Sequence, residues 1–151
     1  MRIYELAKEF KRKYPKTVAW RLKKHAKVIE KHLNPNEEIL YVFAGQKSSH
    51  SYEIFFTNIL VLTNKRLLIA TKRVLFGYIF ISVTPELYND LTIKHRIIWG
   101  KIIIDTVKEV IEISNLDKKS LKSIQNQISD FMIKEKRRKN GTYTPDNSGV
   151  V

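Results

Sequence analysis

The spacing of apolar residues changes after the first quarter of the chain, and the change separates predicted helices from predicted strands. In residues 3–14 apolar side chains recur every three or four positions, which predicts a short amphipathic helix that ends at Pro15. The same spacing continues over residues 18–33. We therefore expect a second helix there, capped at its start by Thr17 and stopped by the Asn-Pro-Asn that follows.

After the second helix, β-branched and aromatic residues form short runs separated by turn-forming residues, a pattern typical of strands. Seven strands are predicted, at residues 39–44, 55–62, 66–72, 77–83, 91–98, 101–107 and 109–114. A tight reversal at Asn64-Lys65 links two strands that are apolar on both sides. This part of the sheet is therefore expected to be covered on both faces.

A second hairpin is predicted at Trp99-Gly100, where glycine would supply the positive φ of a two-residue turn. Residues alternate in character along the strand before this turn. The alternation assigns four residues to the core side of the strand, namely Leu91, Ile93, His95 and Ile97. On this interpretation His95 is a hydrogen-bonded core histidine.

The last periodic segment predicts a C-terminal helix capped by Asp117. Its apolar stripe consists of Leu121, Ile124, Ile128, Phe131 and Met132. The helix leads into a basic run at residues 134–139. The last dozen residues have no apolar periodicity and are predicted to form a mobile tail.

Positive charge is concentrated at the two predicted helical ends. Residues 1–33 contain 11 Lys and Arg against 3 acids, residues 34–116 contain 9 against 8, and residues 117–151 contain 8 against 4. The net charge is +13 and the sequence pI is about 9.9. A nearly neutral β region between basic helices favours a binding protein over an enzyme.

Composition narrows the class of protein further. With 151 residues, 43% of them hydrophobic, the chain can form one globular domain with short appendages. The absence of cysteine excludes disulfides, thiolate metal sites and cysteine nucleophiles. No secretory signal pattern is present and the apolar runs are too short to span a bilayer. A cytoplasmic location is expected, with a membrane serving only as a surface at its inner face.

Three sequence segments carry a resemblance to a known family. Leu-Asn-Pro-Asn-Glu-Glu-Ile-Leu at residues 33–40 and Val-Leu-Thr-Asn-Lys-Arg-Leu-Leu at residues 61–68 resemble the L-x-P-x-E-x-I and L-T-x-x-R-L signatures of bacterial pleckstrin-homology and GRAM-type domains. Ile-Trp-Gly-Lys-Ile-Ile-Ile-Asp-Thr at residues 98–106 is similar to the next hairpin of the YokE-like branch, found in Gram-positive bacteria and their prophages.

The resemblance implies a mainly β (α+β) fold, a pleckstrin-homology-like barrel. In that fold seven bent antiparallel strands are capped by a C-terminal helix, here with an N-terminal two-helix extension. The expected domains are a basic helical arm at 1–33, the pleckstrin-homology-like domain at 34–133, and a basic run with a tail at 134–151. The signature residues serve turns and packing, and they provide no nucleophile, acid/base pair or metal cage.

Outside the signatures, the sequence shows no catalytic or metal-binding motif. The histidines form no H-E-x-x-H or similar motif, and His25 and His32 lie two helical turns apart, too far for both to hold one ion. No nucleotide-binding glycine motif is present, so no cofactor is expected. Asp105, Glu109 and Glu112 interleave with lysines on predicted strands, which indicates cross-strand ion pairs. We expect no enzymatic activity.

The strongest functional candidates are basic residues. In the second helix, five residues spread over the circumference outside the apolar stripe and can face solvent, with Trp20 beside them: Arg21, Lys23, Lys24, Lys27 and Lys31. The C-terminal run adds Lys136, Arg137, Arg138 and Lys139. One interpretation is a charged face that only keeps the protein soluble. The other is a site for binding anions.

Three kinds of anionic partner fit these residues. An adaptor could dock on an acidic protein or on anionic lipid, where each Lys or Arg contributes on the order of 1 kcal/mol. The loop between the first two strands offers only Lys47, which argues against specific phosphoinositide recognition. The alternative is a nucleic-acid-binding accessory protein, which would bind without sequence preference because the chain has no base-reading motif.

Overall fold

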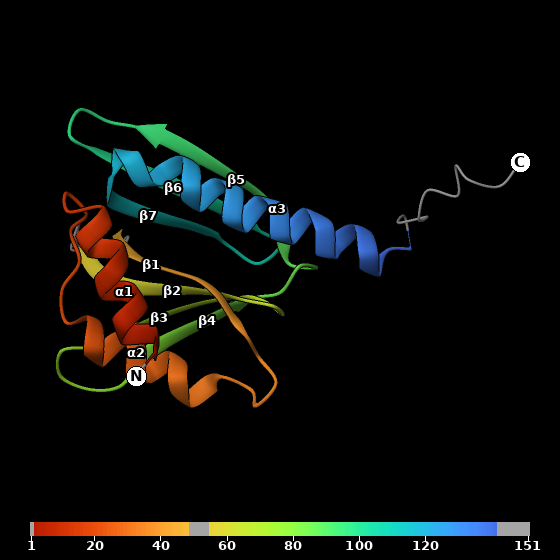
Figure 1. The fold of residues 1–151 in the computed structure, drawn as a ribbon, viewed down its shortest axis with the longest axis horizontal. Coiled ribbons are helices and arrows are strands. Elements are labelled where there is room, and N and C mark those ends of the chain that lie inside the picture. The colour runs from red at the N-terminus through yellow and green to blue at the C-terminus, as the bar shows by residue number, and fades with distance from the viewer. Residues whose placement is uncertain (1, 49–54, 142–151) are drawn as a thin grey trace, which may run out of the picture.

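The computed structural model of the chain describes residues 2–48 and 55–141 (Figure 1). Its helices are α1 (Arg2–Lys13), α2 (Leu22–His32) and α3 (Leu121–Lys139), the last preceded by a 3₁₀ turn at Lys118–Ser120. Its strands are β1 (Ile39–Ser48), β2 (Phe55–Thr63), β3 (Leu67–Lys72), β4 (Tyr78–Val83), β5 (Tyr88–His95), β6 (Trp99–Thr106) and β7 (Val110–Asp117).

The seven strands form one antiparallel sheet in the order β4-β3-β2-β1-β7-β6-β5. β1 pairs with β7 at Gln46 and Ser114, and the curled sheet forms a half-barrel. α3 lies against β5 and β6 on one face of the sheet, and α2 lies on β2 and β3 on the other face (Figure 1). α1 packs against β1 and contributes side chains to the apolar cores on both faces. The predicted seven-stranded pleckstrin-homology-like sheet with one C-terminal and two N-terminal helices is confirmed.

Each face of the sheet has its own apolar core. On β1, Phe43 points into the core under α3, and its neighbour Val42 points into the core under α1 and α2. β2 and β3 alternate in the same way, so Leu60 and Val61 are both fully buried on opposite faces. The prediction that both faces are covered here is confirmed. The turn at Asn64-Lys65 also lies where it was predicted.

The second helix begins later than predicted, at Leu22, and Thr17 does not cap it. Thr17 instead accepts a hydrogen bond from the backbone N–H of Asp117 through Oγ1 (3.1 Å), and the N–H of Val18 donates to the carbonyl of Asn115 (2.9 Å). These long-range bonds hold the α1–α2 linker against the end of β7. They replace the helical bonds that the local pattern predicted.

The β5–β6 hairpin turns earlier than predicted. Trp99 and Gly100 both lie in β6, Gly100 pairs with His95, and the turn falls on Ile97 and Ile98. The prediction that these side chains of β5 face the core is confirmed for Leu91, which is buried, and in part for Ile93, which is partly buried and packs against the core. It is wrong at His95 and Ile97, which are exposed. Gly100 is therefore not a turn residue.

Asp117 caps the C-terminal helical segment as predicted, because its carboxylate accepts from the N–H of Lys119 (3.0 Å). α3 then continues through the basic run to Lys139. The predicted mobile tail falls on residues that the structure does not describe, apart from its first two positions. Within the described part of the chain, no helix is long and apolar enough to cross a membrane.

Candidate functional site

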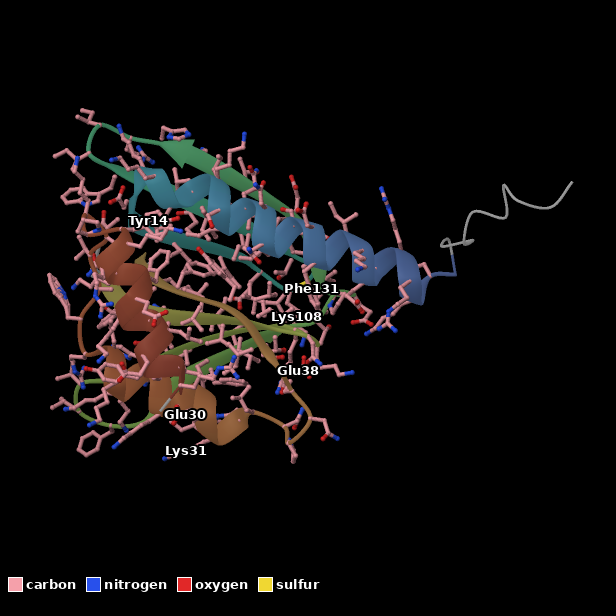
Figure 2. The ribbon with its side chains drawn as sticks, viewed as in Figure 1. Tyr14, Glu30, Lys31, Glu38, Lys108 and Phe131 are labelled. Carbon is pink, nitrogen blue, oxygen red and sulfur yellow. The ribbon has the colours of Figure 1, made fainter. Side chains whose placement is uncertain are left out.

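α2 lies on β3, with its apolar side on the sheet and its basic side outward. Leu22, Ala26 and Ile29 are buried, as the amphipathic pattern requires. The five predicted binding residues of this segment are all exposed. They are the N-cap residue Arg21 and, within the helix, Lys23, Lys24, Lys27 and Lys31. Figure 2 shows Lys31 at the outer edge of the molecule, pointing away from the sheet.

A buried histidine fixes α2 to the sheet. Nδ1 of His25 accepts a hydrogen bond from the backbone N–H of Lys72 (2.8 Å), so the ring is held as an acceptor at the end of β3. Burial and, to a smaller extent, the nearby charge of Arg21 lower the pKa of His25 from 6.5 to about 4. His25 is thus neutral at physiological pH and positions the helix that carries the cations.

The linker before α2 has an unusual backbone at Arg21, whose φ of 55° lies in the left-handed region. Most L-residues avoid this region because adopting it costs about 1 kcal/mol or more. The preceding N–H, that of Trp20, donates to Oγ1 of Thr57 on β2 (3.2 Å). The chain therefore turns sharply into α2 and leaves the Trp20 side chain half exposed beside the basic helix.

The C-terminal basic run occupies the last turns of α3, away from the N-terminal end of α2 (Figure 1). Two of its cations have partners on the segment around the start of β5. Lys136 Nζ donates to the carbonyl of Tyr88 (2.6 Å), and Lys139 Nζ contacts the carboxylate of Glu86 (2.5 Å). Arg138 pairs with Glu135 one turn earlier (2.7 Å). The fold does not bring this run together with α2 into one patch.

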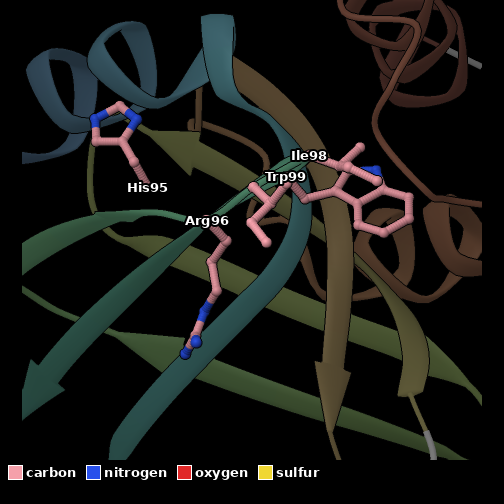
Figure 3. A pocket seen from close by; sticks show the side chains of 5 residues that line it. His95, Arg96, Ile98 and Trp99 are labelled. Atoms are coloured by element: carbon pink, nitrogen blue, oxygen red, sulfur yellow. The ribbon is translucent and has the colours of Figure 1, made fainter.

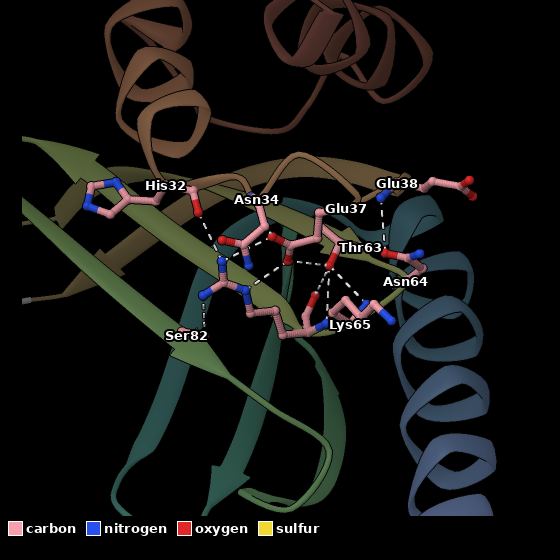
Figure 4. Close-up of polar contacts among 9 residues, drawn as sticks. His32, Asn34, Glu37, Glu38, Thr63, Asn64, Lys65 and Ser82 are labelled. Atoms are coloured by element: carbon pink, nitrogen blue, oxygen red, sulfur yellow. Dashed lines mark hydrogen bonds and ion pairs between the residues drawn. The ribbon is translucent and has the colours of Figure 1, made fainter.

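The signature residues meet in a polar cluster beside the C-terminal end of α2 (Figure 4). The guanidinium of Arg66 donates to both oxygens of the Glu37 carboxylate (2.8 and 3.1 Å) and to the carbonyl of His32 (3.0 Å). Oγ1 of Thr63 donates to the same carboxylate (2.9 Å). The cluster joins the end of α2 to the β2–β3 turn, so its role is structural.

The exposed tip of the β5–β6 hairpin forms a shallow hollow lined by residues 95–99 (Figure 3). The side chains of His95, Arg96 and Trp99 point in different directions, so no reacting centre is assembled there. Within residues 2–48 and 55–141, no group of three or more His, Asp or Glu side chains could hold a metal ion.

One expected cross-strand ion pair is present, between Lys101 and Glu112 (2.8 Å).

Two features of this region were missed at the sequence level. The anchoring role of His25 depends on a backbone amide 47 positions away, which no local pattern reveals. The β3–β4 turn exposes an unbroken apolar run, Val74-Leu75-Phe76. Its sequence signal is visible in retrospect, because three large apolar residues stand between Arg73 and Gly77 where a turn is expected to be polar.

Comparison with known proteins gives one family match and distant structural neighbours. A family model described as "Bacterial PH domain" matches residues 33–130. A pleckstrin homology domain from Shewanella amazonensis SB2B is similar at 15% identity and a TM-score of 0.48, covering 76% of this chain and 91% of that one. A DUF1696 family protein with a pleckstrin-homology domain from Shewanella loihica PV-4 is similar at 16% identity and a TM-score of 0.46, covering 71% and 92%. No curated protein matches the chain.

Proposed function

Because the chain belongs to the bacterial PH domain family, we propose that it is a non-enzymatic binding module that docks on an anionic surface through the basic face of α2. The surface is an acidic protein partner or the inner face of a membrane, and the protein acts there as an adaptor. The proposal depends on one observation. In the described part of the chain, the side chains of Lys23, Lys24, Lys27 and Lys31 are exposed and engaged in no hydrogen bond or ion pair.

Unpaired cations on a rigid helix favour binding over a purely solubilising role. α2 contains one acid, Glu30, so almost no intramolecular attraction competes with an external anion. Each Lys near an anionic leaflet contributes about 1 kcal/mol, and the helix presents four in three turns. His25 and the Arg66 cluster hold both ends of the helix on the sheet, which limits the entropy lost on docking.

The C-terminal run is proposed as a second, weaker contact. Lys136, Arg138 and Lys139 already have intramolecular partners, so binding an external anion there must replace existing contacts. Arg137 is exposed near the end of the helix. We place the primary docking surface on α2 for this reason.

The narrower assignments made from the sequence also remain proposals. These are membership of the YokE-like branch, a Gram-positive or prophage origin, and division of the chain into an arm at 1–33, a domain at 34–133 and a tail at 134–151. A cytoplasmic protein that associates peripherally with the membrane is consistent with the docking proposal. It is supported by the net charge of +13.

Vesicle sedimentation tests the lipid half of the proposal. The full chain is mixed at low salt with vesicles of phosphatidylcholine alone or of phosphatidylcholine with phosphatidylserine. We expect the protein to pellet only with the anionic vesicles and to be released as salt rises, since mobile ions screen exposed charges within about 10 Å at 0.1 M salt. Equal pelleting with both vesicles, or none with either, rules out the membrane surface.

A gel-shift salt series with duplex DNA and single-stranded RNA tests the nucleic-acid alternative in parallel. Retention at near-physiological salt would favour that alternative, provided it is lost when Lys23, Lys24, Lys27 and Lys31 are changed to glutamine. Vesicle binding without such retention favours the docking proposal. The two experiments use the same protein preparations, so a folding defect would show in both.

A further inference from the structure

The tip of the β3–β4 hairpin exposes three consecutive large apolar side chains. Val74, Leu75 and Phe76 are 72%, 81% and 84% exposed. The hairpin is closed by a hydrogen bond from the N–H of Arg73 to the carbonyl of Gly77 (3.1 Å), and Gly77 takes a positive φ of 72°. The backbone is therefore ordered as a turn while its side chains find no cover on their own domain. Exposed apolar runs of this kind mark interaction sites.

The hairpin lies beside the N-terminal end of the basic helix (Figure 1). His25 binds the N–H of Lys72, and Nη1 of Arg21 approaches the carbonyl of the same residue (3.5 Å). The apolar tip and the first turn of α2 are thus held together by contacts at the base of the hairpin. Both belong to one surface of the molecule.

The chain segments that surround the tip carry only positive charge. The sequence contains no acidic residue from Phe55 to Pro85, or from Phe10 to Ile29. Arg73 is exposed at the base of the tip and Arg21 is exposed at the start of α2. Trp20, 53% exposed, directly precedes Arg21 in the chain. Tryptophan favours the boundary between lipid headgroups and acyl chains.

We propose that the β3–β4 tip inserts into an anionic bilayer while α2 rests on the lipid headgroups. Val74, Leu75 and Phe76 would enter the boundary between headgroups and acyl chains, and the cations beside them would bind the negatively charged lipids. This inference rests on the proposed function and makes it specific. It names lipid as the occupant and assigns the apolar contact to one hairpin.

A bilayer fits this surface better than a protein partner does. The apolar residues project at a hairpin tip, and a protein partner would need a pocket of complementary shape to receive them. A fluid bilayer accommodates a projecting tip without a preformed pocket. The flanking positive charge also matches the inner leaflet, whose surface potential is negative.

A fluorescent reporter at the tip tests insertion directly. The variant Phe76→Trp keeps the tip apolar, and Val107→Trp places the same reporter at the β6–β7 turn, where Val107 is 65% exposed. Figure 2 shows the neighbouring Lys108 on the side of the molecule away from the N-terminal end of α2. Both variants retain the two native tryptophans, so they share one background signal. Phosphatidylcholine–phosphatidylserine vesicles with brominated acyl chains serve as the quencher.

We expect the quenching to be clearly stronger for Phe76→Trp than for Val107→Trp. A matched pair of neutral double variants then measures the apolar contribution. Leu75→Ser with Phe76→Ser should weaken binding to anionic vesicles about 10-fold or more, since burial of large apolar side chains is lost. Val107→Ser with Val110→Ser should bind as the unaltered protein does.

The outcomes separate this inference from the proposed function. If the unaltered protein binds anionic vesicles but the tip reporter is not preferentially quenched and the tip variant binds normally, insertion is wrong and docking by α2 stands. If the α2 glutamine variant also binds normally, docking by α2 is wrong as well. Binding to an acidic protein but to no vesicle overturns the insertion proposal. None of these variants alters a core residue or the positive-φ Gly77.

Discussion

At the scale of single residues, Gly100 shows how a position can require glycine without a turn. A Cβ atom added there would lie 2.3 Å from Cδ1 and 2.8 Å from Cγ of Leu121, the first residue of α3. Leu121 is fully buried and has little room to move. Glycine at this position therefore allows the start of α3 to pack closely against β6.

Gly100→Ala should lower the free energy of unfolding by about 1–3 kcal/mol, the usual cost of forcing an extra carbon into a packed core. Urea unfolding measures the change. Leu121→Ala provides the control, because in that background the neighbouring atoms are gone and Gly100→Ala should cost much less. An equal cost in both backgrounds would show that the contact with Leu121 is not the cause.

Glu37 controls a pH-dependent part of the stability. Burial alone would raise the pKa of Glu37, but hydrogen bonds from Arg66, the Asn34 N–H and Thr63 lower it from 4.5 to about 2. A lowered carboxyl pKa stabilises the folded state above the unfolded value, and the stability is lost as pH falls through the folded value. We expect a loss of about 2 kcal/mol between pH 4.5 and about pH 2 from this group.

The Glu37→Gln variant tests this assignment by urea unfolding across the same pH range. It should be less stable at neutral pH, since the Arg66 guanidinium loses its charged partner, and its stability should fall less steeply in acid. A pH dependence identical to that of the unaltered protein would show that Glu37 is not the titrating group.

At the scale of elements, the attachment of α2 to β3 depends on His25. Its folded pKa of about 4 lies below the unfolded 6.5, so the unfolded chain binds more protons between these values. The stability that this group provides is therefore complete above pH 6.5 and declines as pH falls toward 4. Within this window, acid should loosen α2 from the sheet.

His25→Leu should destabilise the protein by about 1–3 kcal/mol, because the N–H of Lys72 loses its acceptor. It should also speed hydrogen exchange at the Lys72 amide. His95→Leu is the matched control, since His95 is exposed and the same substitution there should change neither quantity. Equal effects at both positions would contradict the anchoring role of His25.

Element boundaries differ from the sequence-based predictions where distant bonds outweigh local pattern. The segment before α2 has helical apolar spacing, yet Thr17 and Val18 form hydrogen bonds with Asp117 and Asn115 and are not helical. The β5–β6 turn was placed on Trp99-Gly100 because glycine often marks hairpins. In the structure the glycine is explained by the approach of Leu121, a contact that sequence spacing does not encode.

At the scale of the whole molecule, much of the architecture follows from periodicity and from the family signatures. The seven strands, the Asn64 turn and the Asp117 cap were all predicted. Exposure of the α2 lysines also agrees with the amphipathic pattern. The separation of the C-terminal run from α2 was not predictable, because it depends on how the sheet curls and where α3 ends. The exposed tip at Val74 could be recognised only once the hairpin was seen uncovered.

The central claim is that α2, and not overall charge, makes the docking surface. The most direct test compares two variants with the same change in net charge. The α2 variant carries Lys→Gln at Lys23, Lys24, Lys27 and Lys31. The control carries it at four other exposed lysines, Lys65, Lys94, Lys108 and Lys122.

The measurement is the partition coefficient of each variant on phosphatidylcholine–phosphatidylserine vesicles at low salt. If each α2 lysine contributes about 1 kcal/mol, the α2 variant should bind about 100-fold or more weakly than the unaltered protein. The control variant should lose far less. Both should unfold at the same urea concentration, because exposed substitutions change stability by only about 0.5 kcal/mol. Equal losses of binding in the two variants would contradict the claim.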